Sequence, residues 1–376
     1  MATIFGTNGA DELIGTAKAD AIHGFWGDDS ISGGGGRDFI YAGNGNDTLD
    51  GGPGFNVLDG GGGFDMVLYG NLLTPFTADL RTGVVSFFGQ PGDTLIDVEA
   101  IDAGYGNDTV IGNGAGNLFR GNGGNDVLTG NIGSDSLIGG LGADSLDGGN
   151  GQDSLVGGFG NDTMLGGLHN DIFTIGPIVG KVDDITLALV DFGRDRIDGG
   201  GGTDTLHVSA PVTFMEYPDA IGSGMGLDIA APDVRANLST GTLRLGGSAN
   251  RSTLVSIENI ETGSGNDSIN GNAGDNYIAA GDGLNVVYAG GGNDTIVGGA
   301  EIYPGFGHEN DYDPLSAIEI LNGGAGNDAI WGMGSEGYTR GGGGDPGLVT
   351  GLDILVGGAS AAARFAFSKR EASKAI

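Results

Sequence analysis

Residues 130–165 read GNIGSDSLI, GGLGADSLD, GGNGQDSLV and GGFGNDTML, which are four consecutive nonapeptides of one pattern. In each of them Gly stands first and fourth, Asp stands sixth, and an apolar residue stands eighth. The pattern continues without a break over 103–174, forms further runs over 6–68 and 262–297, and returns in single or partial copies at 199–207, 323–331 and 351–358. Repetition at a fixed period indicates one structural unit per repeat.

The eighth and sixth positions decide the expected fold. In the 19 repeats of the three runs, the eighth residue is always apolar, and the sixth is Asp in 15 repeats and Asn in four. One apolar residue in nine does not match the period of a helix, but it matches a short strand with a single inward side chain. The glycines suit turns that need positive φ or a close approach. We therefore expect an all-β fold, a right-handed parallel solenoid in which each repeat is a tight turn followed by a three-residue strand.

The pattern G-G-x-G-x-D-x-U-x, where U is apolar, resembles the RTX (haemolysin-type) calcium-binding repeat, and it covers about half of the chain directly. The resemblance implies a parallel β-roll in which two nonapeptides form one coil and Ca²⁺ lies between turns 18 residues apart. It also implies a ligand set for each ion. For one of them, the carbonyls of Gly139 and Leu141 with Asp144 would face the carbonyls of Gly158 and Gly160 with Asp162.

The chemistry of the turns agrees with this resemblance, because Ca²⁺ prefers six to eight carboxylate and carbonyl oxygens. The alternative is that each Asp or Asn bonds the backbone of its own turn, with no metal. That alternative suits an isolated repeat. In a stack, however, carboxylates recur about every 4.7–4.9 Å and repel each other, and Arg120 is the only Lys or Arg in 103–174.

Pairs of repeats 18 residues apart number 13, and nine of them have Asp on both sides, so we expect about nine calcium ions and at most 13. Lys18 and His169 replace the fourth-position Gly, which weakens the neighbouring candidates. The predicted side-chain ligands are Asp11, Asp29, Asp38, Asp47, Asp65, Asp108, Asp126, Asp135, Asp144, Asp153, Asp162 and Asp171. Weaker candidates are Asp20, Asn56, Asn117, Asp204, Asp267, Asp294 and Asp328.

The runs and breaks predict the domain organisation. We expect a first β-roll block at 1–68, connecting coils without calcium at 69–102, a second block at 103–174, an insert at 175–261 with one repeat at 199–207, a degenerate third block at 262–358 with a loop at 300–320, and a tail at 359–376. Both long breaks contain one phrase, TLIDVEAI at 94–101 and TLVSIENI at 253–260, which resembles non-calcium coils between RTX blocks. Its duplication favours a structural role over a catalytic one.

Composition excludes several classes of protein. The 376 residues include 83 Gly and no Cys, and 49 acids against 15 bases give a net charge of −34. These values exclude a disulfide scaffold, a thiolate metal site and a Cys nucleophile. They also argue against a nucleic-acid partner, because a polyanion repels phosphate. No apolar stretch is long enough to predict a transmembrane segment.

No catalytic motif of the HExxH, GxSxG or P-loop type occurs, so we predict that the chain is not an enzyme. Asp183 with Asp184, and His308 in its acidic loop, are more simply solvated than catalytic. The aromatic residues Phe25, Trp26, Phe87 and Phe88 could stack on sugars or pad the solenoid. One alternative is an extracellular polysaccharide enzyme with its site on the solenoid face or in 175–261. Another is a piece of a larger toxin, protease or lipase, although the repeats begin directly after Met1.

The resemblance also implies secretion through a bacterial type I channel, directed by an uncleaved C-terminal signal. Residues 1–16 enter the repeats without a signal-peptide pattern. The tail 359–376 is either that secretion signal or a capping helix. Calcium sites of extracellular modules work at about 10⁻⁴–10⁻³ M. We therefore expect a secreted, extracellular protein that folds on binding Ca²⁺ and has a structural or interactive role, with the secretion machinery and an extracellular surface or polysaccharide as partners.

Overall fold

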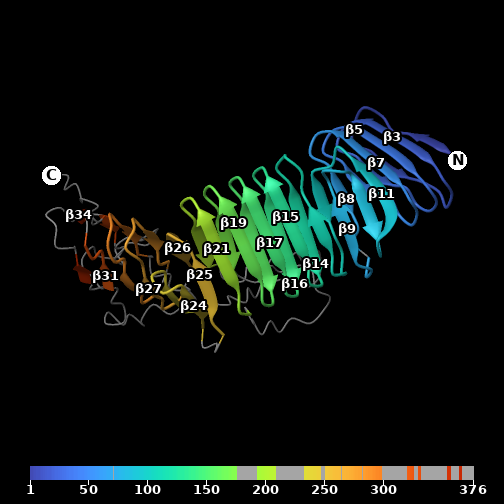
Figure 1. Cartoon of the computed structure of the whole chain (residues 1–376). Helices are drawn as coiled ribbons and strands as arrows, with labels where there is room; N and C mark the ends of the chain where they lie inside the picture. The colour runs from blue at the N-terminus through green and yellow to red at the C-terminus, as the bar shows by residue number, and fades with distance from the viewer. Residues whose placement is uncertain are drawn as a thin grey trace, which may run out of the picture. The chain divides into compact units, whose positions relative to one another are not determined.

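The computed structural model describes residues 1–70, 72–175, 193–208, 233–246, 250–263, 265–281, 283–298, 320–325, 329–331, 354–356 and 364–365, and every regular element among them is a strand (Figure 1). The prediction of an all-β fold is confirmed. The chain forms two compact units, one of residues 1–174 with 191–202 and one of residues 175–190 with 203–376. No helix suited to crossing a membrane occurs in the described ranges. Asp183, Asp184, His308, Asp328 and the loop 300–320, apart from Ile320, lie outside them.

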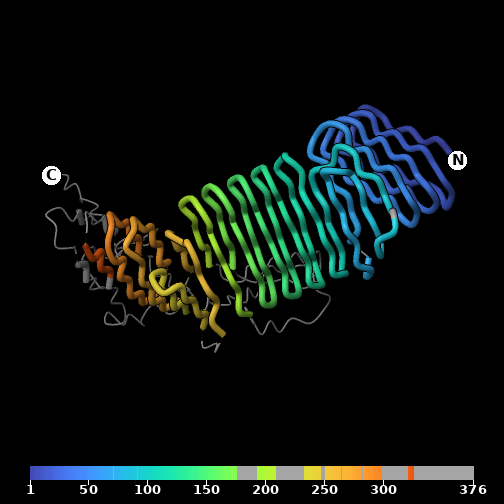
Figure 2. The backbone as a smooth tube through the Cα atoms, in the orientation of Figure 1, coloured from blue at the N-terminus to red at the C-terminus, as the bar shows by residue number. Residues whose placement is uncertain are grey.

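The first unit is a parallel solenoid in which successive repeats alternate between two sheets (Figure 2). Neighbours within a sheet are therefore 18 residues apart, as Leu137 is from Leu155, and two nonapeptides complete one coil. One sheet contains β1 (Thr3–Phe5), β3 (Ala21–Trp26), β5 (Phe39–Asn44), β7 (Val57–Gly62), β9 (Phe76–Asp79), β10 (Val84–Phe87), β11 (Gln90–Ile96), β13 (Thr109–Ile111), β15 (Val127–Ile132), β17 (Ser145–Asn150), β19 (Thr163–Leu168) and β21 (Arg196–Gly201). The other contains β2 (Glu12–Ile14), β4 (Ser30–Ser32), β6 (Thr48–Asp50), β8 (Met66–Leu68), β12 (Ala100–Asp102), β14 (Leu118–Gly123), β16 (Ser136–Leu141), β18 (Ser154–Phe159) and β20 (Ile172–Ile175).

Many strands are longer than the three residues that we expected. Strands β14 to β19 each contain six residues, because the first three residues of the following repeat continue the ladder. The continuation keeps the same register, with a gap of one residue in the pairing. Ile138 pairs with Val156 and Gly140 with Gly158, while Gly139 between them is skipped. The glycine turns are thus partly strand, and each carries a local bend that brings its backbone close to the neighbouring coil.

The core is one column of apolar side chains behind each sheet. The eighth-position residues Leu128, Leu137, Leu146 and Leu155 are all 0 % exposed. Each stacks on the equivalent residue of the next coil, since Leu128 pairs with Leu146 and Leu137 with Leu155. Burying one such side chain contributes about 1.5–3 kcal/mol. A single large apolar residue per nine makes a sparse core, so other interactions must hold the turns.

The first long break is a three-stranded insertion into one sheet. Strand β9 pairs antiparallel with β10 and β10 pairs antiparallel with β11, while β11 and β9 continue the parallel stack onto β7 and β13. In the other sheet β8 pairs directly with β12. The phrase TLIDVEAI supplies the end of β11 and the beginning of β12, so it is structural in the first unit.

The second unit repeats this plan. One sheet contains β23 (Val234–Asn237), β24 (Thr242–Leu245), β25 (Ser252–Val255), β27 (Ser268–Asn270), β29 (Val286–Tyr288), β31 (Ile320–Asn322) and β33 (Ile354–Val356). The other contains β22 (Thr205–Val208), β26 (Asn259–Thr262), β28 (Tyr277–Ala279), β30 (Thr295–Val297), β32 (Ala329–Trp331) and β34 (Arg364–Phe365). Again β23, β24 and β25 form an antiparallel insertion, while β22 pairs directly with β26. Within the tail, the described residues Arg364 and Phe365 form a strand that pairs with β32.

Candidate cation sites in the turns

The sixth-position side chains are buried and form ladders along the turns. The backbone N–H of Asp126 donates to Oδ1 of Asp144 at 2.8 Å, and the N–H of Asp144 donates to Oδ1 of Asp162 at 2.9 Å. On the opposite side of the coils, Asp135 and Asp153 are joined in the same way at 2.8 Å. One carboxylate oxygen of each residue is therefore used to tie a turn to the turn 18 residues earlier.

The second carboxylate oxygen has no such use. Oδ2 is buried and accepts no hydrogen bond from the described residues in Asp29, Asp38, Asp47, Asp65, Asp108, Asp126, Asp135, Asp144, Asp153 and Asp267. All of these except Asp267 belong to the predicted principal ligands. A buried charged oxygen without a partner is costly, so ten of them in equivalent positions indicate that a cation belongs beside them.

The first-position glycines line a cradle next to this oxygen. A Cβ on Gly139 would lie under 3.0 Å from both Oδ2 of Asp144 and the carbonyl oxygen of Gly157. The same holds at Gly121, where the two oxygens come from Asp126 and Gly139. At these two turns a larger residue would enter a space that carboxylate and carbonyl oxygens share, whereas Ala42, Ala103 and Thr262 stand first in the turns of Asp47, Asp108 and Asp267.

The second- and fourth-position glycines place further carbonyls along the turns. Gly158 and Gly160 have φ of 103° and 130°, a region that only Gly enters readily. The carbonyl of Gly160 is directed at the next turn, because a Cβ on Gly193 would collide with it. The carbonyl of Leu141 accepts a hydrogen bond from the N–H of Gly124 at 2.9 Å, which leaves it a second lone pair.

Burial disfavours the charged form of these carboxylates and so raises their pKa values. It raises the pKa of Asp126 to about 8, with smaller contributions from the neighbouring charges of Asp144 and Asp108. Burial likewise raises the pKa of Asp144 to about 7 and that of Asp135 to about 6, and the next carboxylate on the ladder adds to both shifts. The turns thus favour either a bound proton or a bound cation over a bare charge.

Four turns satisfy the sixth residue internally instead. Oδ2 of Asp11 and Oδ2 of Asp20 accept the N–H of Thr7 and of Thr16 at 2.6 and 2.7 Å, and hydrogen bonds from Thr16 lower the pKa of Asp20. Oδ1 of Asn117 and Oδ1 of Asn276 accept an N–H in the same way. The second residues of these four turns, Thr7, Thr16, Asn113 and Asn272, lack positive φ. Without that backbone turn the N–H points at the side chain, so these turns follow the metal-free alternative.

Asparagine side chains show what the other turns need. Nδ2 of Asn56 donates to the carbonyl of Gly52 at 3.1 Å, and Nδ2 of Asn285 donates to the carbonyl of Gly281 at 2.9 Å. Both acceptors are second-position carbonyls of the same turn. An amide NH₂ therefore supplies a hydrogen-bond donor where Asp offers only another oxygen.

The remaining predicted ligands are also buried. Oδ1 of Asp171 and Oδ1 of Asp294 accept the backbone N–H of the sixth residue 18 positions earlier, at 2.9 Å in both cases. Asp204 donates its N–H to Oε2 of Glu258 at 3.0 Å.

Of the two residues that replace a fourth-position Gly, His169 keeps a positive φ of 83°, whereas Lys18 does not. The turn of Asp171 therefore keeps the backbone of a glycine turn.

Four acids outside the three runs extend the ladders and were missed from the sequence. Asp93, Glu99, Asp195 and Glu258 accept the N–H of Asn56, Asp65, Asp162 and Asp204, at 2.7, 3.0, 3.1 and 3.0 Å respectively. Each is followed two positions later by a buried apolar residue: Leu95, Ile101, Ile197 and Ile260. The short signal acid–x–apolar could have found them. Glu99 and Glu258 come from the duplicated phrase, so each copy of that phrase supplies the last acid of a hydrogen-bond ladder.

The donor set favours a hard cation. No group of three or more His, Cys, Asp or Glu side chains suited to a metal occurs among the described residues. The available ligands are pairs of carboxylates with backbone carbonyls, which suit Ca²⁺ and not the N- and S-rich sites of Zn²⁺.

Several exposed aromatic residues contact one another, whereas Trp26 and Phe88 remain 61 % and 79 % exposed. The rings of Phe5 and Tyr41 stack on His23 with centroids 5.4 and 5.0 Å away, and Phe25 lies 6.2 Å from the same ring. Phe87 packs 6.0 Å from Phe76. These contacts fit padding of the solenoid by Phe25 and Phe87, and they do not explain Trp26 and Phe88.

Comparison with known proteins agrees with this geometry. The model of the RTX calcium-binding nonapeptide repeat matches residues 5–40, 41–71, 99–128, 111–146, 120–155, 147–174, 190–210, 256–287, 274–301 and 316–346, more than half of the chain. No curated protein matches. The crystal structure of the extracellular lipase LipA from Serratia marcescens is similar at 17 % identity and a TM-score of 0.18, over 68 % of this chain and 38 % of the lipase. This chain thus spans well under half the length of that lipase.

Proposed function

Because the chain belongs to the family of RTX calcium-binding nonapeptide-repeat proteins, we propose that it is secreted and that Ca²⁺ completes its fold outside the cell. The row of ten buried Oδ2 atoms without a donor among the described residues carries this proposal. A cation that binds only the folded turns adds its binding free energy to the free energy of folding.

The residues that would hold the ions are the paired Asp side chains together with turn carbonyls. When bound, Ca²⁺ supplies a divalent charge that neutralises two facing carboxylates. Nine pairs of repeats have Asp on both sides, and two of them contain Asp11 or Asp20, whose turns satisfy Oδ2 without a metal. We therefore propose about seven ions, with 13 as the upper limit that the repeats allow. The turns of Asp11 and Asp20 are the weakest candidates in the first block, because hydrogen bonds within each turn already satisfy Oδ2.

We propose secretion by the type I route, which the family implies and with which the same linkage is compatible. At the low calcium concentration of the cytosol, a chain of net charge −34 repels itself and stays expanded, which suits export. Millimolar calcium outside the cell then folds it. We propose that residues 359–376 carry the export signal.

We propose a structural or interactive role, in adhesion, a surface coat or a matrix, and not a catalytic one. Hydrogen-bond ladders and cation turns account for the buried acids, and the two duplicated insertions are structural. Assays of the calcium-loaded protein on alginate, pectin, casein and lipid esters test this directly. Turnover of any of them that survives further purification would replace the interactive role by an enzymatic one.

Limited proteolysis tests folding and export together. At submicromolar free Ca²⁺ the full chain should be cleaved throughout, and at millimolar Ca²⁺ it should resist cleavage. Coexpressed with a type I channel, the full chain should reach the medium and a chain lacking 359–376 should stay inside. Protease resistance that is independent of calcium, or equal export of both chains, would contradict the proposal.

A further inference from the structure

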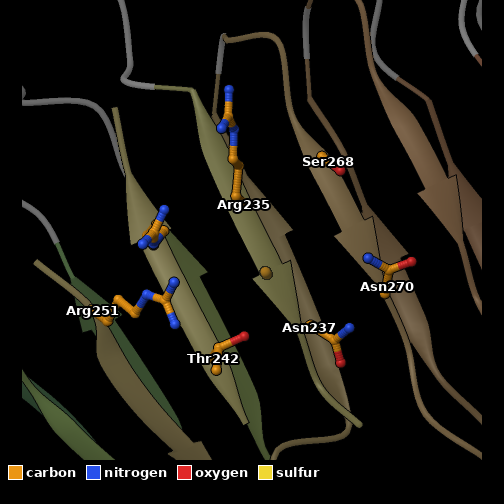
Figure 3. Close-up of a pocket in the computed structure, with 8 residues that line it drawn as sticks. Arg235, Asn237, Thr242, Arg251, Ser268 and Asn270 are labelled. Atoms are coloured by element: carbon orange, nitrogen blue, oxygen red, sulfur yellow. The ribbon is translucent and has the colours of Figure 1, made fainter. Parts of the chain in front are cut away.

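Three arginines gather on the outer face of the second unit (Figure 3). Arg235 lies on β23, Arg244 on β24 and Arg251 immediately before β25, and together they line a cavity of about 240 Å³. The whole chain has only 15 Lys and Arg residues and a net charge of −34. A fifth of all basic residues therefore meet in one pocket, on a chain in which acids outnumber bases threefold.

The strand register forces two of these charges together. Arg235 and Arg244 are directly opposite each other in the antiparallel pair β23–β24. Like charges in that position destabilise a sheet. None of the three arginines forms an ion pair within the described part of the chain, and Nε of Arg244 is buried without an acceptor there. The pair is thus unfavourable unless an anion lies between the guanidinium groups.

The rest of the lining is neutral and able to donate. Beside Ala236, the lining contains Asn237, Thr242, Ser268 and Asn270, and no carboxylate lines the pocket (Figure 3). Hydroxyl and amide groups can donate to an oxyanion that the guanidinium groups attract. The cavity therefore offers charge and hydrogen-bond donors to one kind of ligand.

The first unit shows that the fold does not require these arginines. Its insertion has the same hairpin, in which Gly83 has φ of 67° where Gly241 has 64°. At the positions of Arg235 and Arg244 that hairpin has Thr77 and Ser86, which also pair directly. The same backbone is thus built with small neutral residues, and the two arginines at these positions need another explanation.

We propose that this pocket binds a tetrahedral oxyanion, a sulfate or phosphate group, either free or carried on a sugar. Guanidinium groups bind such oxyanions through paired N–H donors, and Arg suits this role better than Lys. Three positive charges accommodate the two charges of free sulfate or of a phosphate monoester as well as the single charge of a sulfate ester. This site is separate from the cation turns, so it does not depend on the proposed calcium stoichiometry.

Isothermal titration of the full, calcium-saturated chain tests the site at low ionic strength. Sodium sulfate and glucose 6-sulfate should bind with one site per chain, and glucose should not bind. Equal affinities for the two ligands would assign the site to the free ion, and tighter binding of glucose 6-sulfate would assign it to a sugar-borne group. Both results support an oxyanion site.

The β9–β10 hairpin of the first unit shows which residues to introduce in the test variants. Arg235→Thr and Arg244→Ser introduce the residues that stand at Thr77 and Ser86, and each should weaken sulfate binding about tenfold or more, the effect of losing a charged hydrogen bond. Arg81→Ser is the control, because Arg81 is already paired with Asp79 at 2.7 Å and the second hairpin has Ser239 there. Calcium-induced circular dichroism confirms that each variant folds. No binding of either sulfate ligand, or unchanged affinity in both folded variants, would overturn the proposal.

Discussion

The backbone N–H of Asp126 donates a hydrogen bond of 2.8 Å to Oδ1 of Asp144, while Oδ2 of Asp144 is buried and accepts no hydrogen bond from the described residues. One carboxylate thus does two different things. Its first oxygen fixes the spacing of successive turns, and its second oxygen needs a positive group that these parts of the chain do not supply. Asn56, whose amide donates to Gly52, shows a turn in which the protein supplies that group itself.

Asp144→Asn should therefore exchange a calcium ligand for an internal donor. We expect a loss of one or two bound ions, since Asp144 faces two neighbouring turns, and a higher stability of the calcium-free protein. Isothermal titration gives the ion count, and the β-signal that the chain keeps in EGTA, followed by circular dichroism, gives the stability of the calcium-free state. Glu12→Gln, on an exposed strand position, is the control and should change neither. An unchanged ion count in Asp144→Asn would contradict the assignment.

The reverse exchange, Asn56→Asp, should destabilise the calcium-free protein. It removes the Nδ2 bond to Gly52 and adds a buried carboxylate beside Asp38 and Asp93, a loss of about 1–3 kcal/mol. Saturating calcium should recover the stability and add one bound ion. Circular dichroism in EGTA and with 5–10 mM calcium, about ten times the upper range of extracellular sites, measures the folded fraction without and with calcium, and isothermal titration counts the bound ions. A variant that is as stable as the wild type in EGTA would contradict the inference that the Asn56 amide takes the place of a cation in its turn.

Gly139→Ala should weaken calcium binding without backbone strain, because Gly139 does not have positive φ. The added methyl would lie under 3.0 Å from Oδ2 of Asp144 and the carbonyl of Gly157, and overpacking of this kind costs about 1–3 kcal/mol. The control is Gly114→Ala, since no atom lies within 4 Å of its added Cβ. We expect a lower calcium affinity and melting temperature for Gly139→Ala only. Equal behaviour of the two variants would show that no cradle exists at Gly139.

The calcium-free protein should become less stable as the pH rises from 5 to 8. Burial raises the pKa of Asp126 to about 8, of Asp144 to about 7 and of Asp108 to about 6, whereas an unfolded Asp titrates near 4. The folded state therefore binds more protons than the unfolded state between these values, so stability is full below about pH 4 and is lost as the pH rises through the folded pKa values. The β-signal of the calcium-free chain at pH 5, 6, 7 and 8, followed by far-ultraviolet circular dichroism, measures how much folded protein remains at each pH. Stability that increases with pH over this range would contradict the buried, unpaired carboxylates.

Sequence periodicity predicts the coil, the column of residues such as Leu137 and Leu155, and the burial of the sixth position, because one strict repeat determines all three. It does not separate Asp11 from Asp144, since that difference depends on whether the second residue, Thr7 or Gly140, enters positive φ. Periodicity does not predict Asp93 and Asp195, because only fragments of the repeat surround them. Periodicity does not predict the arginine pocket either, because an antiparallel hairpin brings Arg235 and Arg244 together and the repeat pattern does not encode that pairing.

The central claim is that cations complete the turns, and a calcium titration followed by far-ultraviolet circular dichroism tests it most directly. The purified full chain, stripped of metal at pH 7.5, should give a spectrum with little β-structure. Stepwise addition of CaCl₂ to the millimolar range should produce a cooperative gain of β-signal, EGTA should reverse it, and equal MgCl₂ should not reproduce it. A chain that shows its full β-signal before calcium is added, and the same spectrum afterwards, would contradict the account.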